Sequence, residues 1–288
     1  LNPVLLTSGS IAAMLRAVAF IGLIAVGQTL LMVAGEIDLS VGSVAGLCAV
    51  VSGWLMVKLH WPVAPSLAAG LCAGAAAGLI NGLLAVRVGL PAFIATLGML
   101  YMARGITYAI CSGYPLYPLP ASLTRFGKMS PLGISCAFFV FLVLAIIGDF
   151  ILRRTVFGRS VCATGGNAEV ARIAGIRAGG VKLACYVLTG TLAGLAGILM
   201  AAQVGVAQPD FGTGWELDVI AAVVIGGVSL FGGVGTVRGP VLGLLLLQVV
   251  RSGLITSGVN TYWQTATVGF IIVAAVSVDI LRRRTKPG

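Results

Sequence analysis

Apolar runs long enough to cross a membrane recur along almost the whole of this sequence. Each is roughly 17 to 25 residues long, and an α-helix needs about 20 apolar residues to span some 30 Å of hydrocarbon. Only 9% of the 288 residues are charged and 59% are hydrophobic, whereas soluble domains are about 25% charged. The sequence therefore predicts an all-α polytopic membrane protein and excludes a soluble globular domain.

The apolar runs predict a bundle of about nine transmembrane helices in a single domain covering 1–288. Helices are expected because a helix satisfies its own backbone hydrogen bonds in lipid, and the sequence lacks the short alternating strands of a membrane barrel. The connections are too short for a second domain, so a large catalytic domain would have to belong to another polypeptide. The predicted spans are 11–34, 41–57, 66–86, 91–111, 133–151, 183–203, 215–231, 238–256 and 262–281.

The distribution of charge predicts the orientation. The 18 basic residues outnumber the 8 acidic ones, and this excess fits the positive-inside rule better than nucleic-acid binding. The connection 152–182 and the tail after 281 hold more than half of the basic residues and are predicted to be cytoplasmic, which places 112–132 outside. The same alternation of crossings places the first residues outside, which predicts one further span before Leu1 and ten helices in the intact chain.

The span 215–231 is the weakest of the set. It is short, it opens with Glu216 and Asp218, and it runs into a glycine-rich stretch. A re-entrant loop is the alternative. We expect a full crossing, because a re-entrant loop would leave the basic C-terminal tail outside the cell.

Glycines spaced four residues apart predict how the helices pack. Gly70, Gly74, Gly78 and Gly82 form one such series, and Gly190 with Gly194 repeats the spacing. In lipid there is no hydrophobic drive between helices, so small residues that permit close backbone approach hold a bundle together. We expect these glycines to form packing seams.

The basic connection 152–182 contains the signals of a short helix. Asn167 is a good N-cap, Glu169 lies in the first turn and Gly175 is a typical terminator. Apolar residues fall at spacings of three and four on one face, namely Val170, Ile173 and Ala174. Such a helix either rests on the lipid headgroups or docks into a groove on a cytoplasmic partner.

Few residues of this chain are suited to catalysis. The six cysteines are scattered without a Cys-x-x-Cys pair and His60 is the only histidine, so neither a metal site nor a catalytic residue is predicted. The chain has no phosphate-binding Gly-x-x-x-x-Gly-Lys-Ser/Thr loop, so it is not expected to be an ATP-hydrolysing enzyme. Arg104 is the main charged residue inside a span, with Arg16 and Arg251 as further candidates. We expect no acidic residue at mid-membrane, which disfavours a proton-driven carrier.

Several separate blocks of the sequence resemble one transporter family. The blocks are AGEIDLSVGS at 34–43, GLING at 78–82, PAFIATLG at 91–98, ARG at 103–105, GGN at 165–167, AGI at 174–176, AQP at 207–209, GTGWELD at 212–218, and the glycine pairs 226–227 and 232–233. In these blocks the chain is similar to the permease subunit of bacterial ABC importers of the ribose, xylose and galactose type. It departs from the family at Glu36, where a second glycine is common, and in lacking the family's first transmembrane helix.

The resemblance implies a homodimeric or heterodimeric permease in the bacterial inner membrane, surrounded by lipid and without nucleic-acid partners. Two cytoplasmic ABC ATPase subunits would dock below and a periplasmic binding protein would deliver a monosaccharide from above. ATP and Mg would bind the ATPase, with no cofactor on this chain. Alternating access, driven by ATP, would move the cargo. The resemblance makes the short internal helix a coupling helix, with Asn167, Glu169, Val170, Arg172, Ile173 and Ala174 as its candidate residues.

The translocation path is harder to assign from the sequence. Sugars favour aromatic faces and amide or charged hydrogen-bonding groups, but packing explains the same residues equally well. The candidates are Asn81, Phe93, Arg104, Gln203, Gln208 and Trp215. Arg104 is expected either to form hydrogen bonds between helices or to line a cavity. Glu36 and Asp38 are expected either to stay hydrated in a surface turn or to contact the coupling machinery or an arginine of 152–182.

Other transport functions stay open at this point. A permease for branched-chain amino acids, nucleosides or a sugar-derived signal would have the same architecture. An ATP-independent carrier or channel is the alternative from another class, and the apolar stripe of the internal helix disfavours it. The identity of the cargo cannot be predicted, because in such importers the binding protein performs most of the selection.

Overall fold

The computed structural model describes residues 7–260 and single residues or short groups between 263 and 277. The described residues are helical apart from turns and one isolated bridge between Leu116 and Ala207, so the all-α prediction is confirmed. Within these described residues, six helices are long and apolar enough to cross a membrane. They are α1 (Ser8–Val33), α3 (Val63–Leu83, extended by the π-helical turn Leu84–Val88), α4 (Ala92–Cys111), α6 (Cys136–Arg154), α9 (Ala178–Val204) and α11 (Arg238–Thr256).

These helices agree with the predicted spans to within a few residues. The shorter α2 (Val41–Val57) and the long α11 begin and end near the predicted positions. The predicted count of nine spans is not confirmed, because the last one, 262–281, lies largely outside the described residues and 215–231 is not a single helix.

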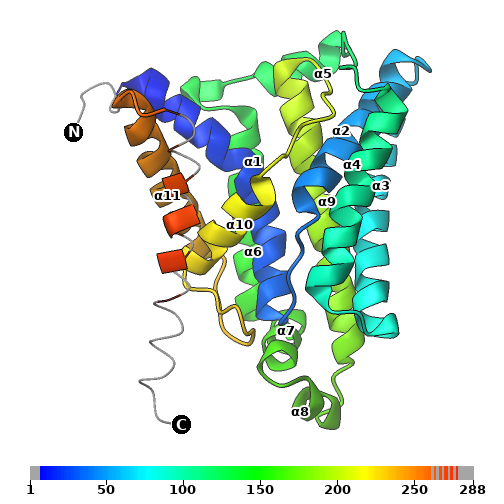
Figure 1. Cartoon of the computed structure of the whole chain (residues 1–288), viewed down its shortest axis with the longest axis vertical. Helices are drawn as coiled ribbons and strands as arrows, with labels where there is room; N and C mark the ends of the chain where they lie inside the picture. Colours follow the sequence, from blue (N-terminus) through cyan, green and yellow to red (C-terminus); the bar gives the residue numbers. More distant parts are fainter. Residues whose placement is uncertain are drawn as a thin grey trace.

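Helix α1 forms the centre of the bundle. Every residue from Val18 to Val33 is buried, and α6, α9, α10 (Trp215–Ile225) and α11 all contact this helix. Helices α2, α3 and α4 pack together on the far side of α9 (Figure 1). An all-round apolar helix is expected to be buried or to face lipid, so only the packing distinguishes α1 from its neighbours.

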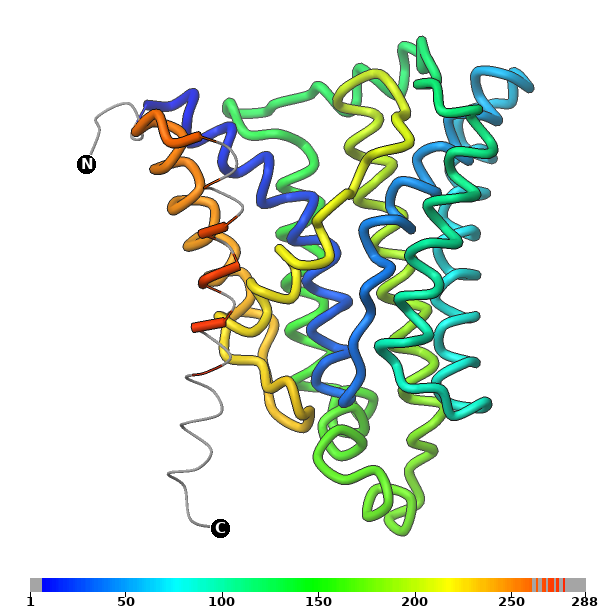
Figure 2. The backbone as a smooth tube through the Cα atoms, in the orientation of Figure 1, coloured from blue at the N-terminus to red at the C-terminus, as the bar shows by residue number. Residues whose placement is uncertain are grey.

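Two crossings of the bundle are interrupted, because each combines a non-helical segment with a short helix. After α1 ends, residues 34–40 run extended along its lower half before α2 begins (Figure 2). After α9 ends, residues 205–214 descend without helix to α10, which continues to the lower end of the bundle where α11 begins (Figure 1). The expectation of a full helix over 215–231 was wrong: α10 ends at Ile225, and turns occupy 226–237. The alternating count of crossings still holds, because 205–225 as a whole connects the two ends.

The two interrupted crossings belong to units that run in opposite directions. Helix α1 descends, the chain turns upward through α2, and α3 descends again; α9 ascends, α10 descends and α11 ascends (Figure 1). The four residues 36–39, Glu-Ile-Asp-Leu, resemble 216–219, Glu-Leu-Asp-Val, at the two interruptions. Inverted units with discontinuous helices are common in transporters, whose binding sites lie where the interruptions meet.

The predicted glycine seam joins α3 to α9. A Cβ atom on Gly74 would lie 2.5 Å from the carbonyl oxygen of Gly190. A Cβ atom on Gly190 would in turn meet the Gly74 carbonyl. The two backbones are therefore too close for any side chain, which is the packing that the spacing predicts.

The connections lie at the expected ends. Helix α5 (Ala121–Lys128) and the 3-10 turn Pro131–Gly133 lie at the upper end, whereas α7 (Val156–Gly166) and α8 (Ala168–Ile173) lie at the lower end (Figure 1). The basic connection 152–182 and the connection 112–132 are thus at opposite ends of the molecule, in agreement with the charge-based orientation.

Candidate functional site

Helix α8 forms as the sequence signals predict. The Asn167 side-chain oxygen accepts hydrogen bonds from the backbone N–H groups of Glu169 and Val170, both at 3.0 Å. Gly175 has a φ of +82° and follows the helix, a backbone conformation that glycine adopts without strain. The N-cap and terminator predictions are confirmed.

The apolar stripe of α8 faces outward at the lower end of the molecule. Ile173 is 80% exposed and Val170 is 58% exposed, and Ala174 is exposed as well. Ala171, on the opposite face, is buried and holds the helix against the bundle. Glu169 and Arg172 line a shallow hollow between α8 and the beginning of α9. The stripe therefore offers an apolar surface that the described part of the chain does not cover.

A second polar cluster lies inside the bundle at the interruption before α2. The Asp38 carboxylate is 1% exposed and accepts hydrogen bonds from the backbone N–H of Ser40 at 2.7 Å and its hydroxyl at 2.6 Å. The Asn81 amide of α3 donates to the other Asp38 oxygen at 3.3 Å and to the Ser40 hydroxyl at 2.9 Å. The expectation that Asp38 stays hydrated in a surface turn was wrong, because Asp38 is buried among the helices of the bundle.

Glu36 connects the same interruption to the start of α9. Its carboxylate lies 2.6 Å from the ammonium group of Lys182 and accepts a hydrogen bond from the Tyr186 hydroxyl at 3.1 Å. One expectation was that Glu36 contacts an arginine of the connection 152–182, but its partner is Lys182, the last residue of that connection. Lys182 lies in the first turns of α9, soon after α8, so this ion pair links the lower surface to the interior.

Arg104 on α4 binds the second non-helical segment, 205–214. Its guanidinium donates to the backbone carbonyls of Pro209 at 2.7 Å and Phe211 at 3.0 Å. These carbonyls lack helical partners because 205–214 is not helical and runs through turns from 209 to 214, so the arginine supplies the hydrogen bonds that lipid cannot. Of the two roles expected for Arg104, these hydrogen bonds agree with the structural one, in which it bonds to another segment of the bundle.

The two interruptions meet at the N-terminal half of α2. A Cβ atom on Gly42 would contact the Gly212 carbonyl and the Glu216 carboxylate, and one on Gly46 would lie 2.8 Å from the Phe211 carbonyl. The glycines thus let α2 rest directly on 209–216. One Glu216 oxygen is buried and has no hydrogen-bond partner among the described residues.

The candidate path residues fall into different surroundings. Arg104, Gln208 and Trp215 gather around 205–215, and Asn81 belongs to the Asp38 cluster. Trp215 stacks on Phe20 with ring centroids 6.2 Å apart, which is a packing contact. Gln203 is half-buried near the end of α9. Phe93 is 59% exposed near the lower end of α4, about three turns from Arg104, so it does not join the others.

The sequence-based prediction missed a third polar pair. The Arg251 guanidinium of α11 contacts both oxygens of Asp218 on α10, at 2.9 and 3.2 Å. This pair occupies in the second unit the place of Asp38 and Asn81 in the first. The repeated pattern Glu-x-Asp at 36–38 and 216–218 was the signal that would have located it. Among the described residues no group of His, Cys, Asp and Glu is arranged to hold a metal ion.

The comparisons with known proteins agree in one family. The family described as branched-chain amino acid transport system / permease component matches residues 10–276. The L-arabinose ABC transporter permease protein AraH of Azospirillum brasilense is 36% identical over 99% of this chain and 84% of its own length. The autoinducer 2 import system permease protein LsrC of Photorhabdus luminescens is 38% identical over 89% of this chain and 77% of its own length. The ribose import permease protein RbsC of Escherichia coli K12 is 37% identical over 97% of this chain and 88% of its own length. No solved structure matches.

Proposed function

The chain belongs to the family of branched-chain amino acid transport system / permease components, and from that premise we propose that it forms the translocation path for a monosaccharide or a related small polar solute in an ATP-driven importer. It is a multi-pass inner-membrane protein and a transporter subunit. The names of its relatives, which refer to L-arabinose, ribose and autoinducer 2, favour a sugar or a sugar-derived signal as the cargo. Branched-chain amino acids, named in the family description, are the second candidate.

The exposed apolar stripe of α8 is the observation that carries this proposal. The short helix is capped, lies outside the membrane spans and exposes Ile173 by 80%, so its apolar face is suited to a groove on a protein partner. We assign α8 as the coupling helix, with Val170, Ile173 and Ala174 entering a groove of the ATPase. Asn167 and Glu169 stabilise its first turn, and Arg172 lies beside the contact.

Movement of α8 has a direct route into the bundle. Helix α9 follows α8 after a short turn, and its Lys182 holds Glu36 at the start of the extended segment 34–40. That segment leads to Asp38 and the Asn81 cluster. A displacement of α8 by the ATPase would therefore shift the non-helical segment 34–40 and, with it, α2. Because 205–214 packs against α2, that segment would move as well.

The path itself is proposed to run beside α4. This helix exposes a row of large side chains, among them Phe93 at 59% and Tyr101 at 70%, which would face a second permease subunit across the path. Arg104 and Gln208 lie at the inner edge of this face, with Asn81 and Trp215 behind them and Gln203 toward the upper end.

The remaining partners follow from the two ends of the molecule. The upper connection 112–132 exposes Tyr114 by 74% and Tyr117 by 65% and would receive the periplasmic binding protein. The lower end would receive the ATPase, which binds ATP and Mg. This chain is proposed to bind no cofactor.

Replacing Ile173 by Glu tests the proposal. A charge in the centre of the apolar stripe is expected to abolish co-purification of the ATPase from detergent-solubilised membranes of cells that express the full-length importer, because a buried unpaired carboxylate opposes docking. The monomer is expected to elute normally in size-exclusion chromatography, since the side chain is 80% exposed.

Leu132→Glu is the matched control. Leu132 is 94% exposed at the opposite end of the molecule, so this variant places the same charge on an exposed aliphatic position without touching α8. Its ATPase yield is expected to equal that of the wild type. Normal ATPase recovery with Ile173→Glu would overturn the coupling role of α8. Uptake by liposomes that contain this protein alone, driven by a proton gradient, would instead support a carrier in which Asp38 takes part.

A further inference from the structure

A groove runs between α6 and α11 on a side of the bundle that the transport mechanism above does not use. Its volume is about 660 Å³. Apolar side chains form both walls: Leu142, Ile146 and Phe150 follow one face of α6 at intervals of four residues, and Val241 and Leu242 face them from α11. Ile146 is 62%, Phe150 61% and Leu242 68% exposed. The walls lie within two helices long and apolar enough to span a membrane, so these exposed side chains are suited to contact with lipid.

Charged groups close the groove at its cytoplasmic end. Asp149, Arg153 and Arg154 come from the last turns of α6, and Arg238 is the first residue of α11. Three positive charges thus stand against one negative charge. Among the residues that the structure describes, no other acidic residue lines the groove, and these described residues give its cytoplasmic end a net positive charge.

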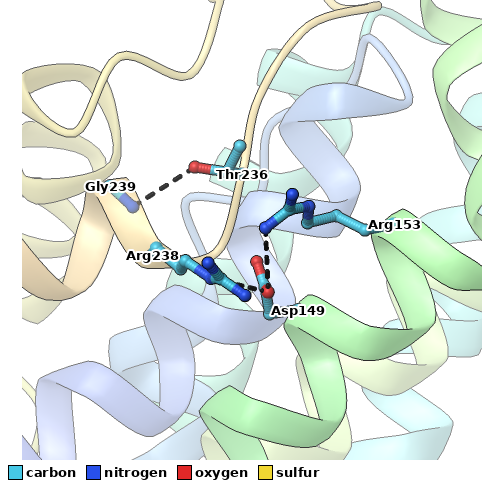
Figure 3. Close-up of polar contacts among 5 residues, drawn as sticks. All are labelled: Asp149, Arg153, Thr236, Arg238 and Gly239. Carbon is cyan, nitrogen blue, oxygen red and sulfur yellow. Dashed lines mark hydrogen bonds and ion pairs between the residues drawn. The ribbon is translucent and has the colours of Figure 1, made fainter.

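Asp149 brings two of the arginines together. Its carboxylate is 10% exposed, and one oxygen accepts a hydrogen bond from Arg238 Nε at 2.8 Å and lies 3.6 Å from an Arg153 terminal nitrogen (Figure 3). The Thr236 hydroxyl accepts a hydrogen bond from the Gly239 N–H at 3.3 Å, which fixes the beginning of α11 next to the carboxylate (Figure 3). The pairing therefore orients both guanidinium groups toward the same end of the groove.

The Arg238 guanidinium keeps most of its hydrogen-bonding capacity. Only its Nε is bonded to Asp149, and the side chain is 72% exposed. In the part of the chain that the structure describes, its two terminal nitrogens have no acceptor. Terminal nitrogens of arginine are well matched to phosphate oxygens, which they bind in pairs.

We infer that this groove binds a phospholipid with an anionic headgroup from the cytoplasmic leaflet. The phosphate lies among Arg153, Arg154 and Arg238, and an acyl chain lies along the apolar walls. Basic pockets between transmembrane helices on the cytoplasmic side suit such headgroups. The net positive charge favours an anionic lipid over a zwitterionic one, and the apolar walls favour a lipid over a soluble anion, which would leave them unused.

A lipid in this place would join two parts of the molecule. Helix α6 leads directly into α7 and α8, whereas α11 begins the last described crossing. A phosphate shared by Arg153 and Arg238 would tie the start of the coupling connection to the second unit of the bundle.

Native mass spectrometry of the purified full-length protein tests the inference. The protein is titrated with dioleoylphosphatidylglycerol, with dioleoylphosphatidylcholine, and with inorganic phosphate. We expect one phosphatidylglycerol to be retained in preference to phosphatidylcholine. In the Arg153→Gln/Arg238→Gln variant its affinity is expected to fall about tenfold or more, since the loss of one charge-assisted hydrogen bond already corresponds to roughly that factor.

Two further variants make the result specific. Arg159→Gln removes the same charge from an exposed position of α7 on the same side and is expected to retain the lipid like the wild type. Leu242→Trp fills the groove while keeping all the arginines and is expected to weaken binding as well, so the test stands even if the double variant does not fold.

Three outcomes would overturn the inference. Equal retention of phosphatidylglycerol and phosphatidylcholine would show that the arginines do not select the headgroup. Displacement of the lipid by inorganic phosphate, with phosphate bound in its place, would indicate a soluble-anion site. Unchanged lipid binding in both groove variants, with loss of another subunit of the importer instead, would assign the groove to a protein partner.

Discussion

Single polar residues carry the interior contacts of this protein. In hydrocarbon every unpaired polar group is costly, so the polar groups at each interrupted crossing need hydrogen-bond partners. Arg104 donates hydrogen bonds to two backbone carbonyls of 205–214. Asn81 and Ser40 donate hydrogen bonds to the Asp38 carboxylate. The pair between Glu36 and Lys182 differs from these, because it spans the interior and the lower surface. A variant of this pair therefore tests directly whether movement at the lower surface is transmitted to the interior.

Exchanging the two charges of this pair tests its role. Their side chains are 13% and 23% exposed, and removing one partner of a largely buried ion pair costs roughly 3 to 5 kcal/mol. We expect Glu36→Lys and Lys182→Glu to lose sugar-stimulated ATPase activity in the reconstituted importer, and the double exchange to recover a large part of it.

The double exchange is the control for general damage. If the two single variants and the double variant are equally inactive while all three remain folded and bind the ATPase, the pair has no coupling role. Recovery in the double variant would establish an interaction energy between the two positions.

At the scale of elements, close backbone contacts replace the interlocking side chains of soluble cores. Helices α3 and α9 meet through Gly74 and Gly190, and α2 meets the non-helical segment 205–214 through Gly42 and Gly46. Van der Waals contact of this kind holds helices together where lipid offers no hydrophobic drive. A methyl group at such a contact is therefore expected to matter more than one at a glycine without close neighbours.

Gly74→Ala and Gly98→Ala form a matched pair for this expectation. A Cβ atom on Gly74 would lie 2.5 Å from the Gly190 carbonyl, whereas one on Gly98 in α4 would have no neighbour within 4 Å. Alanine favours the helix equally at both positions by about 1 kcal/mol, but overpacking costs about 1 to 3 kcal/mol. We expect Gly74→Ala to lower Tm in detergent and Gly98→Ala to leave it unchanged or raise it. Equal Tm values for both variants would contradict the seam.

The whole molecule has two chemically different ends. The lower end carries α7 and α8, and the upper end carries α5 (Figure 1). The basic residues of 152–182 lie on the lower side, whereas 112–132 exposes aromatic side chains such as Tyr114 and Tyr117. The positive-inside rule assigns the lower end to the cytoplasm. The proposed sites for the ATPase, the binding protein and the lipid all depend on this assignment.

Cysteine labelling from the two sides tests it. Leu132→Cys and Val156→Cys are introduced singly after the six native cysteines have been replaced by alanine; the two positions are 94% and 70% exposed at opposite ends. A membrane-impermeant maleimide is expected to label Leu132→Cys in spheroplasts and Val156→Cys only in inside-out vesicles. Labelling of both variants from one side would contradict the orientation.

Properties that depend on length, local spacing or summed charge could be predicted from the sequence. The six long helices follow from the length of their apolar runs, the two ends from the basic residues, and the α3/α9 seam from glycine spacing. Helix α8 follows from Asn167, Glu169 and Gly175, which act within a few residues of one another. The family resemblance rested on local motifs in the same way, and the comparisons confirm it.

Other features were decided only by the tertiary structure. In lipid a protein-facing helix surface and a lipid-facing one are both apolar, so no pattern in α1 marks it as the centre of the bundle. The partners of Asp38 and Arg104 come from distant parts of the chain, and it is these partners that allow 34–40 and 205–214 to leave the helical conformation inside the membrane. The sequence by itself determined that the chain spans the membrane and where α8 forms, and its basic residues predict which end faces the cytoplasm. The packing decided which helix is central, where the crossings are interrupted and which charges meet, because each of these depends on contacts between residues far apart in the sequence.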